Sequence, residues 1–179
     1  NVLTWINPAQ LCPESDDVAG YYVYYAATDD APFTRVAEID RASDTRFEHK
    51  PDRGLAGCYA VSAIDTVGNE SDLSNIVCVD NCPSYVLPNT FSLNGDGVNV
   101  VFKPRAFCFV ERVEFSVYNR WGQLVFQTFD PEIQWDGANL QGRDLPGGAY
   151  YYTCRVFEQR VGGIVPSPDL LSGWIELVR

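Results

Sequence analysis

Short runs rich in β-branched and aromatic residues, separated by turn-forming residues, make up most of this chain. No stretch shows the apolar period of an amphipathic helix, and this spacing of runs and turns is typical of β-sandwiches. We predict strands at residues 2–6, 21–27, 33–39, 45–49, 58–64, 74–79, 112–119, 124–129, 149–157 and 173–179. Because 179 residues are enough for two such domains, the predicted fold class is all-β, with two tandem β-sandwich domains.

A polar stretch at residues 87–102 lies between the two predicted domains. It runs from a short hydrophobic segment through Pro88 and a glycine-spaced series of Asn and Asp to renewed β-branched residues, which indicates a strand, a tight loop and a strand. Just before it, Pro83 and two nearby cysteines indicate a short, stiffened connection. We predict a first domain at 1–80, a linker at 81–84 and a second domain at 85–179.

The charge of the chain limits its partners. The 13 basic and 24 acidic residues give a net charge of −11, which would repel a nucleic-acid backbone or an anionic membrane surface. We therefore expect no nucleic-acid partner, and no apolar run reaches the roughly 20 residues that direct membrane insertion of a helix requires. Residues 1–83 hold 14 acidic and 5 basic side chains, whereas 84–179 hold 10 and 8. The first part resembles a soluble spacer, and the second can face a partner without strong repulsion.

The six cysteines indicate an oxidising compartment, because an even number spread through a β-rich chain favours disulfides. They are Cys12, Cys58, Cys78, Cys82, Cys108 and Cys154. Cys78 and Cys82 have a spacing that would also suit zinc, but no second close pair of Cys or His completes such a site. If each domain closes its own bridges, Cys108 pairs with Cys154.

Three pairings are then open for the other four cysteines. Cys58 and Cys78 lie symmetrically about a turn at Gly68 and are able to face each other across a hairpin. That choice leaves Cys12 and Cys82 at opposite ends of a sandwich. We therefore favour Cys12 with Cys58 and Cys78 with Cys82.

Three patterns in the first half carry a resemblance to a known domain. They are Trp5 shortly before a Pro, Gly-Tyr-Tyr-Val-Tyr-Tyr at 20–25, and Cys-Tyr-Ala-Val-Ser-Ala-Ile-Asp-Thr-Val-Gly-Asn-Glu-Ser at 58–71. Residues 1–80 thus resemble a fibronectin type III domain of the immunoglobulin-like class, with the first strand of that family missing before Asn1. The resemblance implies that the hydroxyl of Tyr59 bonds to nearby backbone. In the 21–25 run, strand alternation favours tyrosines that fill the core over a ligand-binding platform.

The second half contains a longer series of motifs. In order they are Leu-Pro-Asn-Thr-Phe-Ser-Leu-Asn-Gly-Asp-Gly-Val-Asn at 87–99, Val-Tyr-Asn-Arg-Trp-Gly-Gln-Leu-Val-Phe at 117–126, Trp-Asp-Gly at 135–137, Pro-Gly-Gly-Ala-Tyr-Tyr-Tyr at 146–152 and Ile-Glu-Leu-Val-Arg at 175–179. This series is similar to the type B sorting domain of the type IX secretion system, also called the gliding motility-associated C-terminal domain.

The second resemblance implies a function. It implies the C-terminal fragment of a large Bacteroidota surface protein, often an adhesin, that is exported across the outer membrane to the cell surface or the extracellular space. The domain would be the export signal, recognised by the type IX secretion translocon and by a PorP/SprF-type outer-membrane protein.

Five residues are the candidates for partner binding: Asn94, Asp96, Asn99, Arg120 and Trp121. Asn119 and Gly122 favour a tight turn that would hold Arg120 and Trp121 at its tip. At that tip, Trp121 is either an exposed anchor, since Trp and Arg dominate interface energetics, or it folds back onto the edge of the sandwich.

The loop at 92–103 also allows a calcium hypothesis. Asn94, Asp96 and the carbonyl of Val98 fall at the third, fifth and seventh positions of an EF-hand-like loop. However, Ser92 stands at the first position, and Lys103 stands where a bidentate Glu is expected. The alternative is a purely conformational loop in which glycines permit positive φ and Asn and Asp cap the turn. The small number of anionic oxygens favours this alternative.

No catalytic residues are predicted. The single histidine, His49, is expected at the surface, and no nucleophile elbow, phosphate-binding loop, dinucleotide fingerprint or zinc-protease motif is present. The sequence therefore predicts a non-enzymatic secretion and anchoring module behind a fibronectin-like spacer. The alternative is a carbohydrate- or protein-binding accessory module of a secreted hydrolase, using exposed aromatics such as Trp121, Trp135 or the tyrosines at 21–25.

Overall fold

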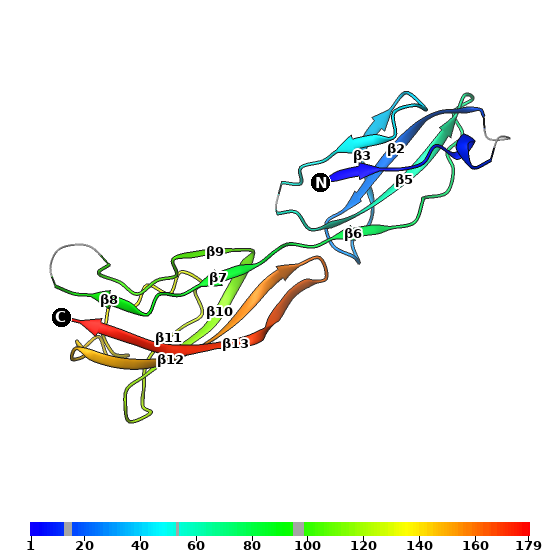
Figure 1. Ribbon diagram of the computed structural model, residues 1–179. Helices are drawn as coiled ribbons and strands as arrows, with labels where there is room; N and C mark the ends of the chain where they lie inside the picture. The colour runs from blue at the N-terminus through cyan, green and yellow to red at the C-terminus, as the bar shows by residue number, and fades with distance from the viewer. Residues whose placement is uncertain (13–15, 53, 95–98) are drawn as a thin grey trace. The chain divides into compact units, whose positions relative to one another are not determined.

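The computed structural model describes residues 1–12, 16–52, 54–94 and 99–179 (Figure 1). The regular elements among the described residues are all strands, apart from a 3-10 helix at Pro8–Gln10, and these residues divide into two compact units. The first unit comprises Asn1–Asn81 with Arg160–Gly163, and the second comprises Cys82–Gln159 with Ile164–Arg179. The predicted all-β fold class with two β-sandwich units is confirmed. Within the part of the chain described, no helix has the length and apolar character needed to span a membrane.

The first unit is a sandwich of two antiparallel sheets. Its larger sheet has the order β3-β2-β5-β6, and its smaller sheet pairs β1 with β4. The strands are β1 (Val2–Thr4), β2 (Val18–Ala26), β3 (Thr34–Ile39), β4 (Arg46–Glu48), β5 (Gly57–Asp65) and β6 (Val77–Val79). Two facing sheets of this kind are those of a fibronectin type III-like sandwich.

Strand alternation sorts the tyrosines of β2 between two faces. Tyr21 is buried and its ring lies 5.2 Å from that of Trp5, while the ring of Tyr25 lies 5.1 Å from that of Tyr59. Tyr24 points the other way, where its hydroxyl donates to the carboxylate of Glu70 at 2.5 Å. Alternate tyrosines thus pack between the sheets, as residues two apart on a strand must, and the core-filling interpretation is confirmed.

The disulfide pairing favoured from the sequence is wrong. Cys58 and Cys78 are bonded to each other, with their Cα atoms 4.0 Å apart. The reason is register, because β5 and β6 are antiparallel neighbours in which Cys58 lies directly opposite Cys78. Cys12 follows the 3-10 helix, is exposed and is unpaired.

The expected roles of Tyr59 and His49 also need correction. The hydroxyl of Tyr59 contacts side chains rather than backbone: it accepts from Asn1 Nδ2 at 2.9 Å and lies 2.9 Å from His49 Nδ1. His49 is half-buried between the rings of Tyr25 and Tyr59, at centroid distances of 4.9 and 5.7 Å, instead of lying on the surface. Burial, reinforced by the N-terminal ammonium group, lowers the pKa of this histidine.

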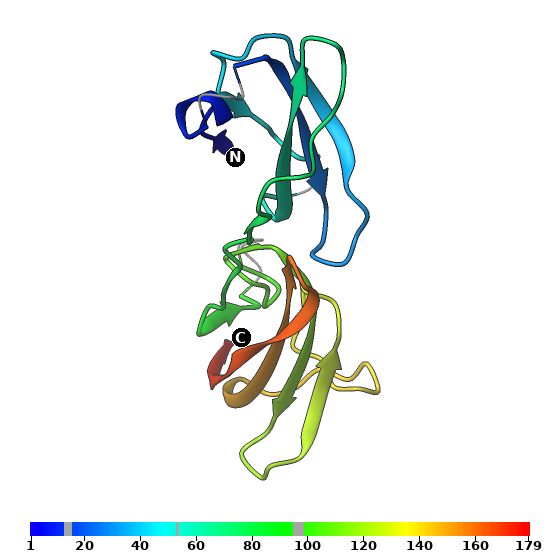
Figure 2. The same cartoon turned by 90° about the vertical axis from the view of Figure 1, so that its right-hand side faces the viewer.

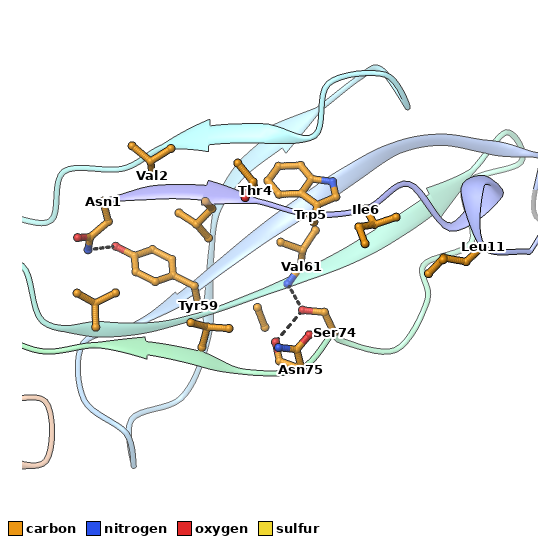
Figure 3. Close-up of a pocket in the computed structure, with 14 residues that line it drawn as sticks. Asn1, Val2, Thr4, Trp5, Ile6, Leu11, Tyr59, Val61, Ser74 and Asn75 are labelled. Carbon is orange, nitrogen blue, oxygen red and sulfur yellow. Dashed lines mark hydrogen bonds between the residues drawn. The ribbon is translucent and has the colours of Figure 1, made fainter.

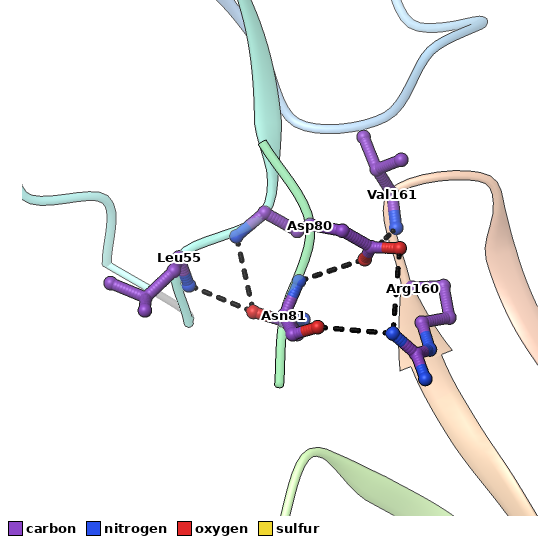
Figure 4. Close-up of polar contacts among 6 residues, drawn as sticks. Leu55, Asp80, Asn81, Arg160 and Val161 are labelled. Atoms are coloured by element: carbon purple, nitrogen blue, oxygen red, sulfur yellow. Dashed lines mark hydrogen bonds and ion pairs between the residues drawn. The ribbon is translucent and has the colours of Figure 1, made fainter. Parts of the chain in front are cut away.

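A polar cluster within the first unit connects Asp80 and Asn81 to the turn at 160–163 (Figure 4). The carboxylate of Asp80 accepts from the backbone N–H of Val161 at 2.9 Å and lies 3.7 Å from Arg160 Nη1. The carbonyl of Asn81 accepts from Arg160 Nη1 at 3.1 Å, and its side-chain oxygen accepts from the backbone N–H of Leu55 at 2.8 Å. The last residues of the first unit are therefore held by charge-assisted hydrogen bonds.

The second unit is built on a five-stranded sheet with the order β11-β10-β12-β13-β8 (Figure 2). The short strands β7 and β9 form a separate two-stranded sheet. The strands are β7 (Ser84–Val86), β8 (Thr90–Ser92), β9 (Ala106–Cys108), β10 (Val110–Tyr118), β11 (Leu124–Thr128), β12 (Gly148–Arg160) and β13 (Gly163–Val178).

Aromatic side chains fill the core of the second unit. Trp135 is fully buried, and its indole N–H donates to the carbonyl of Ala138 at 2.8 Å. Its ring lies 5.2 Å from that of Phe91 and 5.6 Å from that of Tyr150. Phe102 exchanges two backbone hydrogen bonds with Trp135, which ties the segment after the polar loop to the core. The Trp-Asp-Gly motif at 135–137 therefore has a structural role.

Candidate partner-binding site

Several of the motifs in the second half meet at one end of the five-stranded sheet. The antiparallel pair β10–β12 places Tyr118 opposite Tyr151, so the end of β10 lies beside the start of β12. The parallel pair β13–β8 places Val178 opposite Ser92, as Figure 1 shows for the red end of β13 beside β8. We use the name motif end for the described residues at this end of the sheet, namely Leu93, Asn94, Asn99, Asn119–Gly122, Leu145–Tyr151 and Arg179.

The turn at Asn119–Gly122 has a local cause. The side-chain oxygen of Asn119 accepts from the backbone N–H groups of Trp121 and Gln123 at 2.9 and 3.0 Å. The backbone N–H of Gly122 donates to the carbonyl of Asn119 at 2.9 Å, and Gly122 adopts a φ of 75°, which glycine tolerates without strain. These bonds confirm the predicted turn and hold Arg120 and Trp121 at its tip.

Trp121 does not fold back onto the sandwich. It is 77% exposed, and the guanidinium carbon of Arg120 lies 5.5 Å from the centroid of its ring. Arg120 is exposed too, and among the residues described it forms no ion pair. Trp and Arg are both enriched among the residues that contribute most to binding energy at protein interfaces.

A groove of about 310 Å³ lies between this turn and the Pro-Gly-Gly segment. It is lined by Asn119–Trp121 and by Leu145–Tyr151. The Leu145 carbonyl accepts from Arg179 Nε at 2.6 Å, and the hydroxyl of Tyr150 donates to the carbonyl of Pro146 at 2.7 Å. These bonds fix one wall of the groove, while Tyr151, 55% exposed, adds a second accessible aromatic ring.

Arg120 is the only charged residue among the described residues that line the groove. Burial raises the pKa of Tyr150, and the positive charges of Arg179 and Arg120 act in the opposite direction on it. The arrangement offers a guanidinium group, exposed aromatic faces and backbone groups, but no catalytic nucleophile with an activating base. It is suited to binding a carboxylate or an apolar side chain of a partner.

Asn94 and Asn99, the described residues among the remaining predicted site residues, lie at the opposite edge of the same sheet. Asn99 adopts a φ of 53°, and its carbonyl accepts from the backbone N–H of Ser92 at 3.1 Å. Asn94 is described, whereas Asp96 and Val98 lie outside the described residues. β12 and β13 lie between β10 and β8. The turn with Arg120 and Trp121 and the loop end at Asn99 are therefore three strand spacings, roughly 14 Å, apart. They share one end of the sheet but do not form one pocket.

Two sequence-based expectations about the second unit are wrong. Trp135 was grouped with exposed aromatics but is fully buried. Cys108 and Cys154 are not bonded, because Cys154 is buried opposite Phe115 on β10 while Cys108 is exposed at the end of β9. Within the described ranges no group of three or more His, Cys, Asp or Glu gathers as a metal site.

The groove lining from Leu145 to Tyr151 was not predicted as part of the site. The signal was the Pro-Gly-Gly-Ala-Tyr run, which the sequence marks as a turn followed by a strand. Only the antiparallel pairing of β10 with β12 brings this run beside Trp121. Gly147 lies where an added Cβ would be 3.2 Å from the carbonyl oxygen of Leu177, so this run packs closely on the end of β13.

A second hollow lies in the first unit (Figure 3). It has a volume of about 610 Å³ and lies between β1 and the strands β5 and β6. The described side chains that line it are all uncharged: Asn1, Val2, Leu3, Thr4, Trp5, Ile6, Leu11, Tyr59, Ala60, Val61, Ser74, Asn75, Val77 and Val79. The indole nitrogen of Trp5 is shielded from solvent and has no hydrogen-bond partner among the described residues.

Comparison with known protein families identifies the domain that contains the motif end. Residues 85–176 match the CHU_C type IX secretion signal domain. The chain belongs to this family of type IX secretion signal domains, whose members direct export through the type IX secretion machinery across the outer membrane.

This chain is also similar to other proteins, over part of their length or at low sequence identity. An amylopullulanase of Thermoanaerobacterium thermosulfurigenes is 30% identical over 112 residues, which are 62% of this chain and 6% of that protein. The chain thus spans a small fraction of this relative. Chicken CNTN1 FN1–FN3 domains align over 99% of this chain and 62% of theirs, at 14% identity and a TM-score of 0.34. Dimeric latent PorU from Porphyromonas gingivalis aligns over 89% of this chain and 16% of its own, at 15% identity and a TM-score of 0.31.

Proposed function

We propose that this chain is the secretion and surface-targeting part of a large exported protein, an adhesin of a gliding bacterium of the Bacteroidota. Its second unit binds the type IX translocon and a PorP/SprF-type outer-membrane protein through the motif end. The first unit acts as a non-catalytic spacer. The polar loop with Asn94, Asp96 and Asn99 and the tip with Arg120 and Trp121 contact the partner from the two edges of the sheet.

The exposed pair Arg120 and Trp121 is the observation that carries this proposal. A tryptophan that is 77% exposed, next to an exposed arginine, presents two of the residue types that contribute most to binding energy at protein interfaces. The turn that presents it is fixed by the side chain of Asn119, so little conformational freedom is lost when a partner binds. The second unit also contributes little of the negative charge that would repel a partner.

Export of a fusion protein tests the proposal. Residues 84–179 are fused to a foreign periplasmic reporter in a host with a type IX secretion system, and the reporter is measured in the periplasm, on the surface and in the medium. We expect export of this fusion and retention of a fusion with residues 1–83. A fusion with 84–179 that remains in the periplasm contradicts the proposal.

Point variants test the site within that fusion. Trp121→Ala and Arg120→Ala are each expected to lower export at least about tenfold, since interface anchors contribute 2 kcal/mol or more by truncation. Trp174→Ala is the matched control, because Trp174 is 49% exposed on β13 and does not line the groove. Arg155→Ala controls for loss of an exposed cation. Equal losses in the variants and their controls would place the partner contacts elsewhere.

Carbohydrate binding is the second candidate. The accessible rings of Trp121 and Tyr151 both line the groove, and exposed aromatic faces stack on sugars. The 30% identical relative is an amylopullulanase, although this chain covers only 6% of it. Titration of the complete chain with soluble starch fragments, monitored by tryptophan fluorescence, distinguishes carbohydrate binding from the secretion function. Carbohydrate binding is favoured if the fragments quench the fluorescence saturably, if Trp121→Ala abolishes this quenching, and if the same variant is exported normally.

A further inference from the structure

Two exposed cysteines lie close together in the second unit. Cys108 ends β9, and Cys82 lies two residues before Ser84, which is the residue paired with Cys108 in the β7–β9 sheet. The Sγ atom of Cys108 is 3.6 Å from the carbonyl oxygen of Cys82 and 3.3 Å from Ser84 Oγ. Pro83 favours extended backbone at Cys82, and residues two apart in extended chain point to the same face. The thiol of Cys82 therefore shares a face with that of Cys108.

We propose that Cys82 and Cys108 form a disulfide when the chain enters an oxidising compartment. The division of the chain supports this pairing, since the second unit begins at Cys82 and so contains three cysteines. The third, Cys154, is fully buried, and burial raises the pKa of its thiol to about 12. It is neither accessible to an oxidant nor ionised near neutral pH. Cys82 and Cys108 are the accessible pair.

The reaction is a thiol–disulfide exchange with a disulfide oxidant, either glutathione disulfide or an oxidised thiol oxidoreductase. The thiolate of one cysteine attacks a sulfur atom of the oxidant, which forms a mixed disulfide and releases one oxidant thiolate. The second cysteine, as its thiolate, then attacks the protein sulfur of the mixed disulfide and releases the other oxidant thiolate. Two protein thiols are oxidised, one oxidant disulfide is reduced to two thiols, and the protons move from the protein thiols to the oxidant.

The bridge would reinforce the weakest sheet of the second unit. β7 and β9 have three residues each and, among the described strands, pair only with each other, and an isolated two-stranded ribbon is marginally stable in water. The two cysteines are 26 positions apart, so the ring closed by the bridge contains β8 and the polar loop. Closing a ring of this size restricts the unfolded chain and stabilises the folded one.

Disulfide mapping of the complete chain tests the inference. The chain is oxidised with glutathione disulfide, remaining thiols are alkylated, and the protein is cleaved without reduction on the N-terminal side of Asp residues, which separates Cys78 from Cys82 at Asp80. Mass spectrometry is expected to find the Cys82–Cys108 peptide pair beside Cys58–Cys78. Cys82→Ser and Cys108→Ser should each leave the other thiol free to alkylate, and Cys12→Ser, which changes another exposed thiol, should leave the bridge intact.

A second experiment measures the effect of the Cys82–Cys108 disulfide on thermal stability. After oxidation, the wild-type chain is expected to melt at least about 5 °C above the Cys82→Ser/Cys108→Ser double variant, and Cys12→Ser should melt with the wild type. The inference is overturned if Cys82 and Cys108 still alkylate fully in a sample whose Cys58–Cys78 bridge is closed. Recovery of Cys82 linked to Cys12 or to Cys154 overturns it equally.

Discussion

Trp121 and Trp135 show how one residue type serves opposite purposes within one unit. Trp121 stands on a turn whose backbone bonds are made by Asn119, so its ring is not needed to hold the turn. Trp135 has no exposed surface and packs against Phe91, Phe126 and Tyr150. Packing therefore depends on Trp135, and Trp121 is available for contact with other molecules.

Substitution of these two tryptophans should separate stability from binding. We expect Trp135→Ala to lower the free energy of unfolding by about 3–5 kcal/mol, because it opens a large cavity and removes the hydrogen bond to Ala138. Trp121→Ala should change it by less than about 0.5 kcal/mol. Urea denaturation measures both. A loss of more than about 2 kcal/mol in Trp121→Ala would mean that its ring supports the fold.

At the residue scale, the sequence predicted turns between neighbouring residues better than disulfides and other contacts between distant residues. Asn119 and Gly122 were sufficient to predict their turn, because its hydrogen bonds join neighbours in the chain. The exposure of Trp121 was left open between two interpretations, since it depends on what surrounds the turn. The symmetry of Cys58 and Cys78 about Gly68 indicated their pairing, but it was rejected because it would leave Cys12 to pair with Cys82, and in the structure these two cysteines are not bonded.

At the scale of elements, β13 is the largest difference from the prediction. The sequence predicted a strand only at 173–179. In the structure β13 begins at Gly163, and β8 pairs with it only from Glu176 to Val178. Pro166 and Pro168 lie within β13, before the residues that pair with β8, and proline is depleted from strand interiors, so this part of the sequence does not favour a strand. β7 and β9, which have three residues each, were not predicted.

The loop after β8 provides a prediction on calcium. Its ends are already joined by the bond from the backbone N–H of Ser92 to the carbonyl of Asn99, and Lys103 occupies the position of the bidentate Glu. We expect the melting temperature of the chain to be the same in millimolar calcium and in excess chelator. An increase with calcium that chelator reverses and Asp96→Asn abolishes would instead establish a calcium site in this loop.

At the scale of the whole molecule, the net charge of −11 determines the response to salt. Like charges repel in the folded state, and the screening length falls from about 30 Å at 0.01 M salt to about 8 Å at 0.15 M. We expect the melting temperature at pH 7 to rise over this range of sodium chloride. The same series near the isoelectric point of 4.4 is the control, and an equal rise there would rule out charge repulsion as the cause.

The pairing of β8 with β13 has a consequence for synthesis. β8 is made early, at Thr90–Ser92, yet its strand partner is Glu176–Val178, more than eighty residues later. A ribosome that stops before Glu176 leaves β8 unpaired and Leu93 without the carbonyl of Val178 that accepts its N–H. The motif end then lacks one of its two edges. A translation product that stops before Glu176 thus lacks the pairing of β8 with β13 that completes this edge of the signal domain.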